Sequence, residues 1–199
     1  MFIEIQENKT NQHDLRIEGT PNPNTLKFIL GFEILPERQT ISFQSIQDCD
    51  ISNLAKKIWA INNVTGIFYG HDFISVTTDN TSGWHKLKHE IVCVITDYHA
   101  DGQPILNGII PVTQNNHEHL TVDEQEIIQQ IVEVINEKVR PAVAQDGGDI
   151  TFHSYNNGIV YLTMHGACRG CPSSTLTLKD GIENMLKHYI PEVLRVEQI

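Results

Sequence analysis

The sequence predicts an α+β protein of two small domains, and three observations support that fold class. The chain has 199 residues, a length that fits one or two domains with a core in each. Short β-rich runs and segments of helical periodicity occur together in both halves. Residues 101–120 (DGQPILNGIIPVTQNNHEHL) show no sustained period, so we expect a linker there. The predicted domains are therefore residues 14–100 and residues 121–199.

The first domain is predicted to contain strands, a helix, a hairpin and a second helix, in that order. The runs DLRIEG and TLKFIL read as strands on either side of the turn TPNPN, and TISF is a further short strand. A helix is expected after Asp50 or Ser52 as the N-cap residue, followed by the β-rich hairpin of GIFYG and DFISVTT. A second helix is expected to begin near Ser82. Its apolar face consists of Trp84, Leu87, Ile91 and Ile95.

The second domain is predicted to have the order α-β-β-α-β. Its first helix opens with a capping box formed by Thr121 and Glu124. That helix ends or kinks at Arg140-Pro141, because proline disfavours helical geometry in the residue before it. The apolar face of the helix consists of Ile127, Ile131, Ile135 and Val139.

Turn residues and periodicity predict the remaining elements of this domain. The turn DGGD at 146–149 leads into the strand ITFHSY. Asn157-Gly158 is a strong type I′ hairpin signal, and the strand IVYLTM follows it. A last helix stops at Pro191, and VLRVEQI is a candidate final strand. The apolar face of the last helix consists of Leu178, Ile182, Met185 and Tyr189.

Charge and composition argue against several classes of partner. The formal net charge is −11, and neither half of the chain is basic, so we expect no nucleic-acid partner, because neutralising phosphates supplies most of that affinity. No apolar run approaches the roughly 18 residues that a membrane span requires, so we expect no membrane partner. The start lacks a basic region followed by an apolar one. This favours a cytoplasmic protein, and a mitochondrial matrix location would require that a leader has been removed.

A close pair of cysteines is the main chemical feature of the sequence. Four cysteines in a chain without a secretory signal do not suggest a disulfide framework, and a close pair is then more often metal-binding or redox-active. The loop GACRGCPSST contains Cys168 and Cys171. Because Pro172 is favoured at the first helical position, Cys171 is predicted to be an N-cap residue. The amides of the helix end and the charge of Arg169 favour the thiolate form.

Three kinds of site are compatible with this C-x-x-C pair. A strand, C-x-x-C and a helix are also the arrangement of thioredoxin-like enzymes, but here no helix-strand unit of that kind precedes the motif. A structural zinc site needs four ligands, and the sequence has no second C-x-x-C. A four-iron cluster usually takes four thiolates, of which one chain supplies two. A closed four-thiolate site here therefore requires a dimer, with the cluster between the protomers.

Long motifs in both halves resemble the Nfu family, whose members are related to the C-terminal domain of NifU. The resemblance covers about residues 15–100 and 121–197. In the C-terminal half the matching runs are RPAVAQDGGDI (140–150) and GACRGCPSSTLTLKDGIENML (166–186). In the N-terminal half they are GTPNPNTLKFIL (19–30), GIFYGHDFISVT (66–77) and the helix of Trp84.

The resemblance implies an iron–sulfur cluster carrier and not an enzyme with turnover. It implies a [4Fe-4S] cluster bridging a homodimer, with Cys168 and Cys171 of each protomer as ligands. It also implies that clusters come from an upstream scaffold and pass to recipient apo-enzymes. The first half lacks the scaffold cysteines and the ferredoxin-like domain of longer NifU proteins. A dithiol-disulfide oxidoreductase that uses the same two cysteines is the alternative.

Several other residues are predicted to have structural roles. Cys93 is expected to be a small buried hydrophobic residue, and no functional role is expected for Cys49. His165 is expected to be a strand residue without a role toward a cluster. Asp149 is expected to cap the DGGD turn locally, and Asn22 is expected to form the turn between two prolines.

Overall fold

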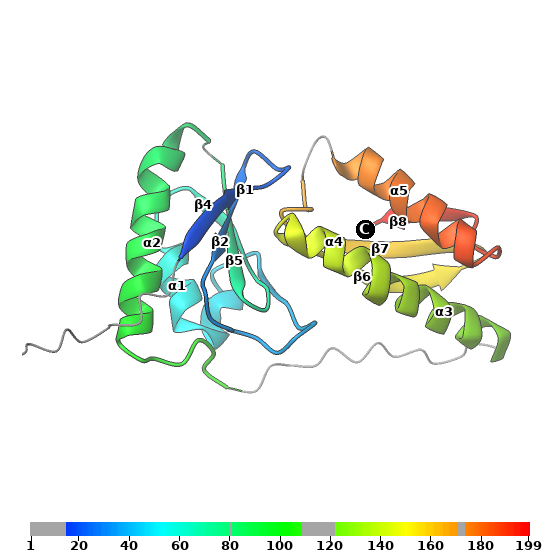
Figure 1. Ribbon diagram of the computed structural model, residues 1–199, viewed down its shortest axis with the longest axis horizontal. Coiled ribbons are helices and arrows are strands. Elements are labelled where there is room, and N and C mark those ends of the chain that lie inside the picture. The colour runs from blue at the N-terminus through cyan, green and yellow to red at the C-terminus, as the bar shows by residue number, and fades with distance from the viewer. Residues whose placement is uncertain (1–14, 80, 109–121, 171–173) are drawn as a thin grey trace, which may run out of the picture.

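The computed structural model describes residues 15–79, 81–108, 122–170 and 174–199. Within them the chain forms two domains that lie side by side (Figure 1). Each domain has a hydrophobic core of its own. The α+β prediction is confirmed, because helices and mostly antiparallel sheets occur together in both domains.

The N-terminal domain is built on a five-stranded antiparallel sheet of order β1-β2-β5-β4-β3. Helices α1 and α2 cover one face of this sheet, and β4 and β5 contact β7 of the C-terminal domain on the other (Figure 1). The two central strands are therefore buried on both faces. The strands are β1 (Arg16–Gly19), β2 (Thr25–Ile29), β3 (Ile41–Phe43), β4 (Val64–Tyr69) and β5 (Phe73–Thr78).

Helix α1 (Asn53–Trp59) begins where the sequence predicts, at Ser52. The Ser52 hydroxyl accepts a hydrogen bond from the Ala55 amide at 3.1 Å, which satisfies one of the unpaired donors of the helix end. A short 3₁₀ turn, η1 (Asp48–Ile51), precedes this cap. The predicted order of strands, helix, hairpin and helix is confirmed.

Helix α2 (Trp84–Ala100) corrects one prediction about a cysteine. It follows the 3₁₀ turn η2 (Thr81–Gly83), and it buries Ile91 and Ile95 as expected. Cys93 lies on the opposite side of the helix and is exposed. The reason is geometric, because a residue two positions from both isoleucines is rotated by about 200° from each of them.

The C-terminal domain packs its helices on a three-stranded sheet of order β6-β7-β8 (Figure 1). Strands β6 and β7 are antiparallel, whereas β8 is parallel to β7. The predicted order α-β-β-α-β is confirmed. The elements are α3 (Val122–Val134), the π-helical turn η3 (Ile135–Val139), α4 (Arg140–Gln145), β6 (Gly148–Asn156), β7 (Ile159–Gly166), α5 (Ser174–Tyr189) and β8 (Arg195–Gln198).

The first helix of this domain does not end at the Arg140-Pro141 step. The π-helical turn η3 precedes it, and the chain then continues as α4 with Pro141 in the first turn. Of the two predicted alternatives, an end or a kink, the structure therefore has a local change of helix type at this step and no end. Thr121 of the predicted capping box lies outside the described residues. The hairpin turn is as predicted, since Asn157 has φ 48° and Gly158 has φ 82°, both positive as a type I′ turn requires.

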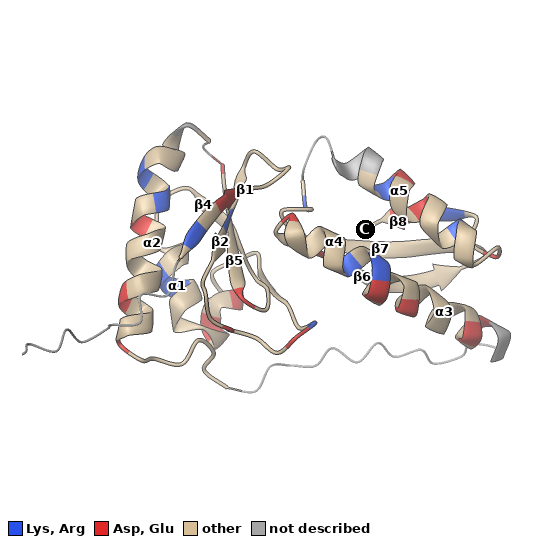
Figure 2. Cartoon of the chain, in the orientation of Figure 1, with Lys and Arg blue, Asp and Glu red and all other residues tan. Residues whose placement is uncertain are grey.

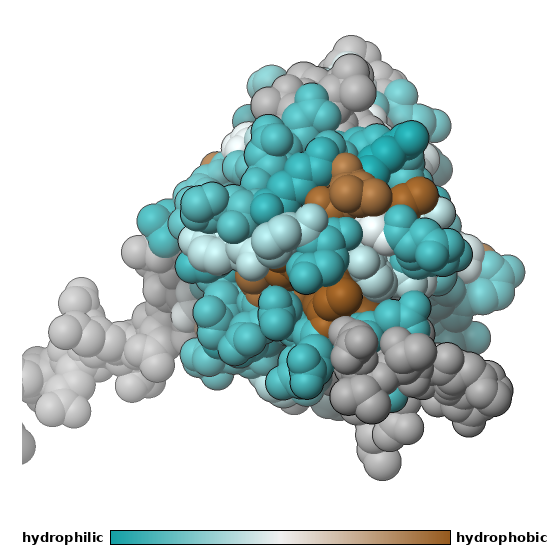
Figure 3. Space-filling view, turned by 90° about the vertical axis from the view of Figure 1, so that its right-hand side faces the viewer, coloured by the Kyte–Doolittle hydropathy of each residue, from teal (hydrophilic) through white to brown (hydrophobic). Residues whose placement is uncertain are grey.

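The surface carries charges of both signs and small apolar areas. Figure 2 shows Lys and Arg side by side with Asp and Glu on both domains. Figure 3 shows the end of the molecule formed by the C-terminal domain, where apolar groups are divided by hydrophilic ones. None of the helices in the described ranges combines the length and the hydropathy that crossing a membrane requires.

Candidate functional site

The candidate site is built where the DGGD turn meets the cysteine loop. The register of the hairpin places Gly148, the first residue of β6, opposite Gly166, the last residue of β7. The Ala167 amide donates to the Gly147 carbonyl at 3.1 Å, which ties the two loops together. Gly147 has φ +80°, a conformation that favours glycine, so the predicted positive-φ turn is confirmed at this position.

Gly148 has a different role from its neighbour, because it leaves room for the thiol. A Cβ atom at Gly148 would lie 2.5 Å from the Cys168 sulfur and 2.9 Å from the Cys168 amide nitrogen. Real Cβ atoms do not approach that closely, so only glycine lets the cysteine loop fold over the start of β6. Cys168 is consequently buried, with 5% of its surface exposed.

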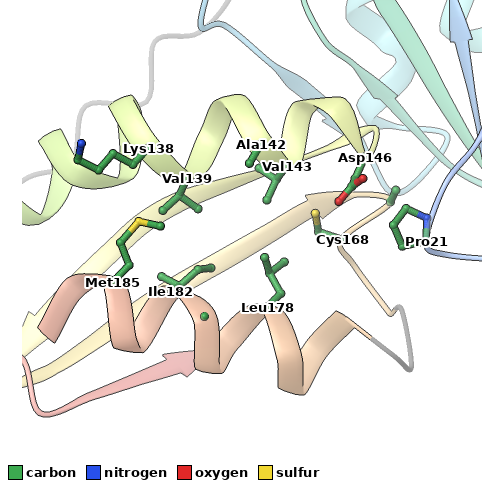
Figure 4. Close-up of a pocket in the computed structure, with 12 residues that line it drawn as sticks. Pro21, Lys138, Val139, Ala142, Val143, Asp146, Cys168, Leu178, Ile182 and Met185 are labelled. Atoms are coloured by element: carbon green, nitrogen blue, oxygen red, sulfur yellow. The ribbon is translucent and has the colours of Figure 1, made fainter. Parts of the chain in front are cut away.

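Cys168 lies at one end of an apolar groove that runs between α5 and the helical segment η3–α4 (Figure 4). The groove has a volume of about 440 Å³. Figure 4 shows Asp146 and Pro21 beside the sulfur, with Lys138 and Met185 at the other end. The lining residues are Pro21, Lys138, Val139, Ala142, Val143, Asp146, Ala167, Cys168, Leu178, Gly181, Ile182 and Met185.

The second predicted ligand, Cys171, lies outside the described residues, and so does Pro172. The described part of α5 begins at Ser174. The role of Cys171 as N-cap residue therefore stays a prediction. The short loop from Cys168 limits how far Cys171 can lie from it along the chain, since two residues separate them and each residue spans at most about 3.6 Å.

Asp149 makes the predicted local contact, since the Ile150 amide donates to its Oδ1 at 2.8 Å, and it also forms an ion pair that was not predicted. The Arg140 guanidinium donates from Nε to Asp149 Oδ1 at 2.8 Å and from Nη2 to Oδ2 at 2.7 Å. Asp149 is 3% exposed, and Thr40 of the N-terminal domain donates a further hydrogen bond to Oδ2 at 2.8 Å. A carboxylate engaged in this way holds the base of the cysteine loop.

Comparisons with known proteins identify both domains. The model of the "NifU-like domain" matches residues 131–197, and that of "Scaffold protein Nfu/NifU N terminal" matches residues 15–102. The chain belongs to the Nfu family. The resemblance to this family drawn from the sequence is thereby confirmed.

Curated relatives of this Nfu protein include two from fruit flies. The chain is 41% identical over 185 residues to the "NFU1 iron-sulfur cluster scaffold homolog, mitochondrial" of Drosophila willistoni. It is 42% identical over 185 residues to the protein of the same name in Drosophila persimilis. Both matches cover 93% of this chain, but only 63% and 64% of the respective relatives.

Among solved structures, a NifU-like protein from Saccharomyces cerevisiae matches at 24% identity. The TM-score is 0.45, and the match covers 55% of this chain and 97% of that one.

The two cysteines of the N-terminal domain, Cys49 and Cys93, are unsuited to join Cys168 in a site. Cys49 is fully buried in the core of the N-terminal domain. Burial, followed by the charge of Asp48, raises the pKa of the Cys49 thiol to about 11, so it is protonated at neutral pH. Cys93 is exposed on α2, with its sulfur 3.9 Å from His89 Nε2. Among the described residues, no group of three or more His, Cys, Asp or Glu side chains is placed to hold a metal ion.

His165 is a partly buried strand residue directly before the loop. Its Nε2 atom lies 3.0 Å from the Thr151 hydroxyl on the paired strand, so this nitrogen is already engaged. Desolvation by burial lowers the pKa of His165, and the charge of Asp149 opposes the shift. The neutral imidazole is therefore favoured in the folded protein.

We expect stability to fall as His165 is forced to take up a proton. Its pKa in the folded state lies below the ordinary value of 6.5. The unfolded state therefore binds this proton first as the pH falls through that value. The His165→Gln variant should show a flatter decline in the free energy of unfolding from about pH 7 to about pH 5. Urea denaturation measures this slope, and His153→Gln, at an exposed position, is the control. Equal slopes in wild type and His165→Gln would contradict the assignment.

Asn22 is the site residue that sequence reasoning missed. It forms the predicted turn, since its carbonyl accepts from the Thr25 amide at 2.9 Å. Its side chain is also buried and donates two hydrogen bonds to the cysteine loop, which was not predicted. Residues that are 145 positions apart give no local signal of such a contact. The only sequence feature that could have drawn attention to it is the amide between two prolines in TPNPN.

Proposed function

We propose that this Nfu protein carries a [4Fe-4S] cluster and passes it to recipient apo-proteins. The observation that carries the proposal is the C-x-x-C loop of a chain whose relatives are named iron–sulfur cluster scaffold homologues. Two thiolates of one chain, from Cys168 and Cys171, are half of the four that such a cluster usually takes. The proposed site is completed by the same two cysteines of a second copy, so the loaded form is a homodimer.

The lack of further ligands around Cys168, in the part of the chain that the structure describes, supports a loop that exchanges its cargo. Within the described residues, the sulfur lines the end of an apolar groove and is not part of a cage of further ligands. A cluster divided between two chains loses half its ligands when the chains separate. Recipient thiols can then replace the carrier thiolates one at a time, without any redox step. The protein acts in this proposal as a carrier between an upstream scaffold and its recipients, and not as an enzyme.

The proposed compartment is one that keeps thiols reduced, because the exchange needs thiolates and not disulfides. The cytoplasm is a compartment of this kind. The named relatives are mitochondrial, and a matrix location is the corresponding proposal for a chain from which a leader has been removed.

The test is a transfer experiment under anaerobic conditions. The protein is loaded with iron and sulfide, desalted, and mixed with an apo-enzyme that needs a [4Fe-4S] cluster, such as apo-aconitase. We expect visible absorbance on loading and enzyme activity after mixing, faster than with the same amounts of free iron and sulfide. Loading without transfer, or transfer no faster than from the free ions, would refute the carrier. Reduction of insulin disulfides by the cluster-free monomer would indicate dithiol exchange instead.

A further inference from the structure

The N-terminal domain holds the backbone of the cysteine loop on both sides of Cys168. The Asn22 side-chain amide donates to the Ala167 carbonyl and to the Arg169 carbonyl, each at 3.2 Å. Asn22 is itself 2% exposed. Its Oδ1 atom accepts from the Asn24 amide at 3.0 Å, which fixes the direction in which the donating end points. The Asn22 side chain therefore bridges the backbone on either side of Cys168, the residue that is proposed to bind the cluster.

Two further side chains of the N-terminal sheet reach the turn under this loop. The Ser75 hydroxyl donates to the Gly147 carbonyl at 2.7 Å. Lys27 Nζ donates to the carbonyls of Ala144 and Gln145 at 2.9 and 3.2 Å, where the last carbonyls of α4 lack partners within the helix. Lys27 is buried in this contact, and the resulting desolvation of its ammonium group lowers its pKa. Each of these donors meets a backbone carbonyl, so the contact recognises the shape of the turn and loop.

A third point of contact lies at the ion pair under the loop. Thr40 donates to Asp149, and Arg140 Nη2 donates to the Arg38 carbonyl at 2.8 Å. Pro21, next to Asn22, lines the groove beside Cys168. The N-terminal domain thus contacts the loop, the turn beneath it and the mouth of the groove at once.

The arrangement in which the N-terminal domain is docked on the cysteine loop conflicts with a cluster shared between two chains. In it the thiol of Cys168 is buried, with Pro21 beside it (Figure 4). To meet the thiolates of a second copy, the loop must turn outward, and its carbonyls must leave Asn22. The same hydrogen bonds that order the loop in a single chain therefore oppose the loaded dimer.

We propose that the N-terminal domain is an intramolecular cap on the cysteine loop, which must be released before two chains can share a cluster. The inference rests on the proposed function above. The docked chain is the cluster-free monomer, and the cap keeps its Cys168 thiol from oxidants and from premature pairing. When a second copy joins to share the cluster, the contact between the two domains of each chain is replaced by a contact between the two chains.

Asn22→Asp is the most direct variant to release the cap. The aspartate keeps the oxygen that accepts from Asn24, but it places a carboxylate against the two carbonyls that the amide now bridges, and acceptors repel one another. Asn24→Asp is the matched control, because Asn24 lies in the same turn and donates no side-chain hydrogen bond to the C-terminal domain within the described residues. Lys27→Met is a second releasing variant, in case Asn22→Asp does not fold.

Two rates measure the cap in the intact chain. The first is alkylation of Cys168 by iodoacetamide in the cluster-free protein, followed by mass spectrometry. Trypsin cleaves after Arg169, so Cys168 and Cys171 are read in separate peptides. The second is the rate at which anaerobic loading produces a dimer with visible absorbance. We expect Asn22→Asp and Lys27→Met to raise both rates by about tenfold, the effect of losing one or two buried hydrogen bonds, and Asn24→Asp to match wild type.

The outcomes separate the cap from the carrier. Equal alkylation of Cys168 in wild type and in both releasing variants would overturn the cap, since the loop would not be held. Faster alkylation with unchanged or slower loading would also overturn it, because the contact would then only support the loop. If wild type itself loads no cluster, the proposed function fails and this inference fails with it. If the wild type loads a cluster normally but the releasing variants show no increase in either rate, the cap is overturned and the proposed carrier function stands.

Discussion

Replacing Cys168 with alanine is expected to remove the bound cluster entirely. In the proposed dimer this single change deletes two of the four thiolates at once, one from each chain. Water and neutral side chains are poor substitutes for thiolates on iron. No other described cysteine can move into the gap, because Cys49 is buried and protonated and Cys93 lies on the far helix α2. We therefore expect bound iron to fall from about four atoms per dimer to background, measured after anaerobic loading and desalting.

Cys93→Ala is the matched control for this loss. It makes the same chemical change at an exposed position on α2, so we expect iron content and visible absorbance equal to those of wild type. Retention of the full cluster in Cys168→Ala would show that this residue is not a ligand. Loss of the cluster in Cys93→Ala would show that the site includes a cysteine of the N-terminal domain.

Replacing Gly148 with alanine is expected to destabilise the loop without removing a ligand. The new methyl carbon would lie 2.5 Å from the Cys168 sulfur and 2.7 Å from the His165 carbonyl oxygen. The His165 carbonyl cannot move far, since His165 lies in the ladder between β6 and β7, and the Cys168 amide nitrogen would lie only 2.9 Å from the methyl carbon. Overpacking of this kind costs about 1–3 kcal/mol, so the midpoint of urea denaturation should fall. We also expect bound iron to fall by more than half, because the new methyl group displaces the Cys168 sulfur from the position that the loop gives it.

Gly181→Ala is a control that is expected to raise stability, where Gly148→Ala lowers it. Gly181 lies within α5, and a Cβ atom there would meet nothing within 4 Å. Alanine is more favourable than glycine inside a helix by about 1 kcal/mol, so this variant should gain stability and keep its cluster. If Gly148→Ala were as stable as wild type and loaded normally, the close packing of the sulfur on β6 would not be required for the site.

Local patterns in the sequence were sufficient to predict most of the fold. Ser52 could be predicted as a cap from one residue and its neighbours, and the structure has it in that role. The turn at Asn157-Gly158 follows from backbone preferences of two residues. Such features depend on residues a few positions apart, and this is the range over which propensity and periodicity carry information.

The features that were not predicted depend on residues far apart in the chain. The expected burial of Cys93 was wrong because apolar neighbours in EIVCVIT hide which side of the helix each residue occupies. Asp149 makes the expected local contact with the Ile150 amide, but its further partners Arg140 and Thr40 lie nine and 109 positions away. Asn22 meets the cysteine loop only because the two domains pack together. No local pattern reports on packing between domains.

Sharing of one cluster by two chains is the central claim, and native mass spectrometry of the loaded protein tests it most directly. The protein is loaded anaerobically, and its mass is measured under conditions that keep non-covalent complexes intact. The account predicts a species of two chains that contains about four iron and about four sulfide ions, and a single chain without iron. A single chain that contains a whole cluster would contradict it, as would a dimer with one complete cluster in each chain.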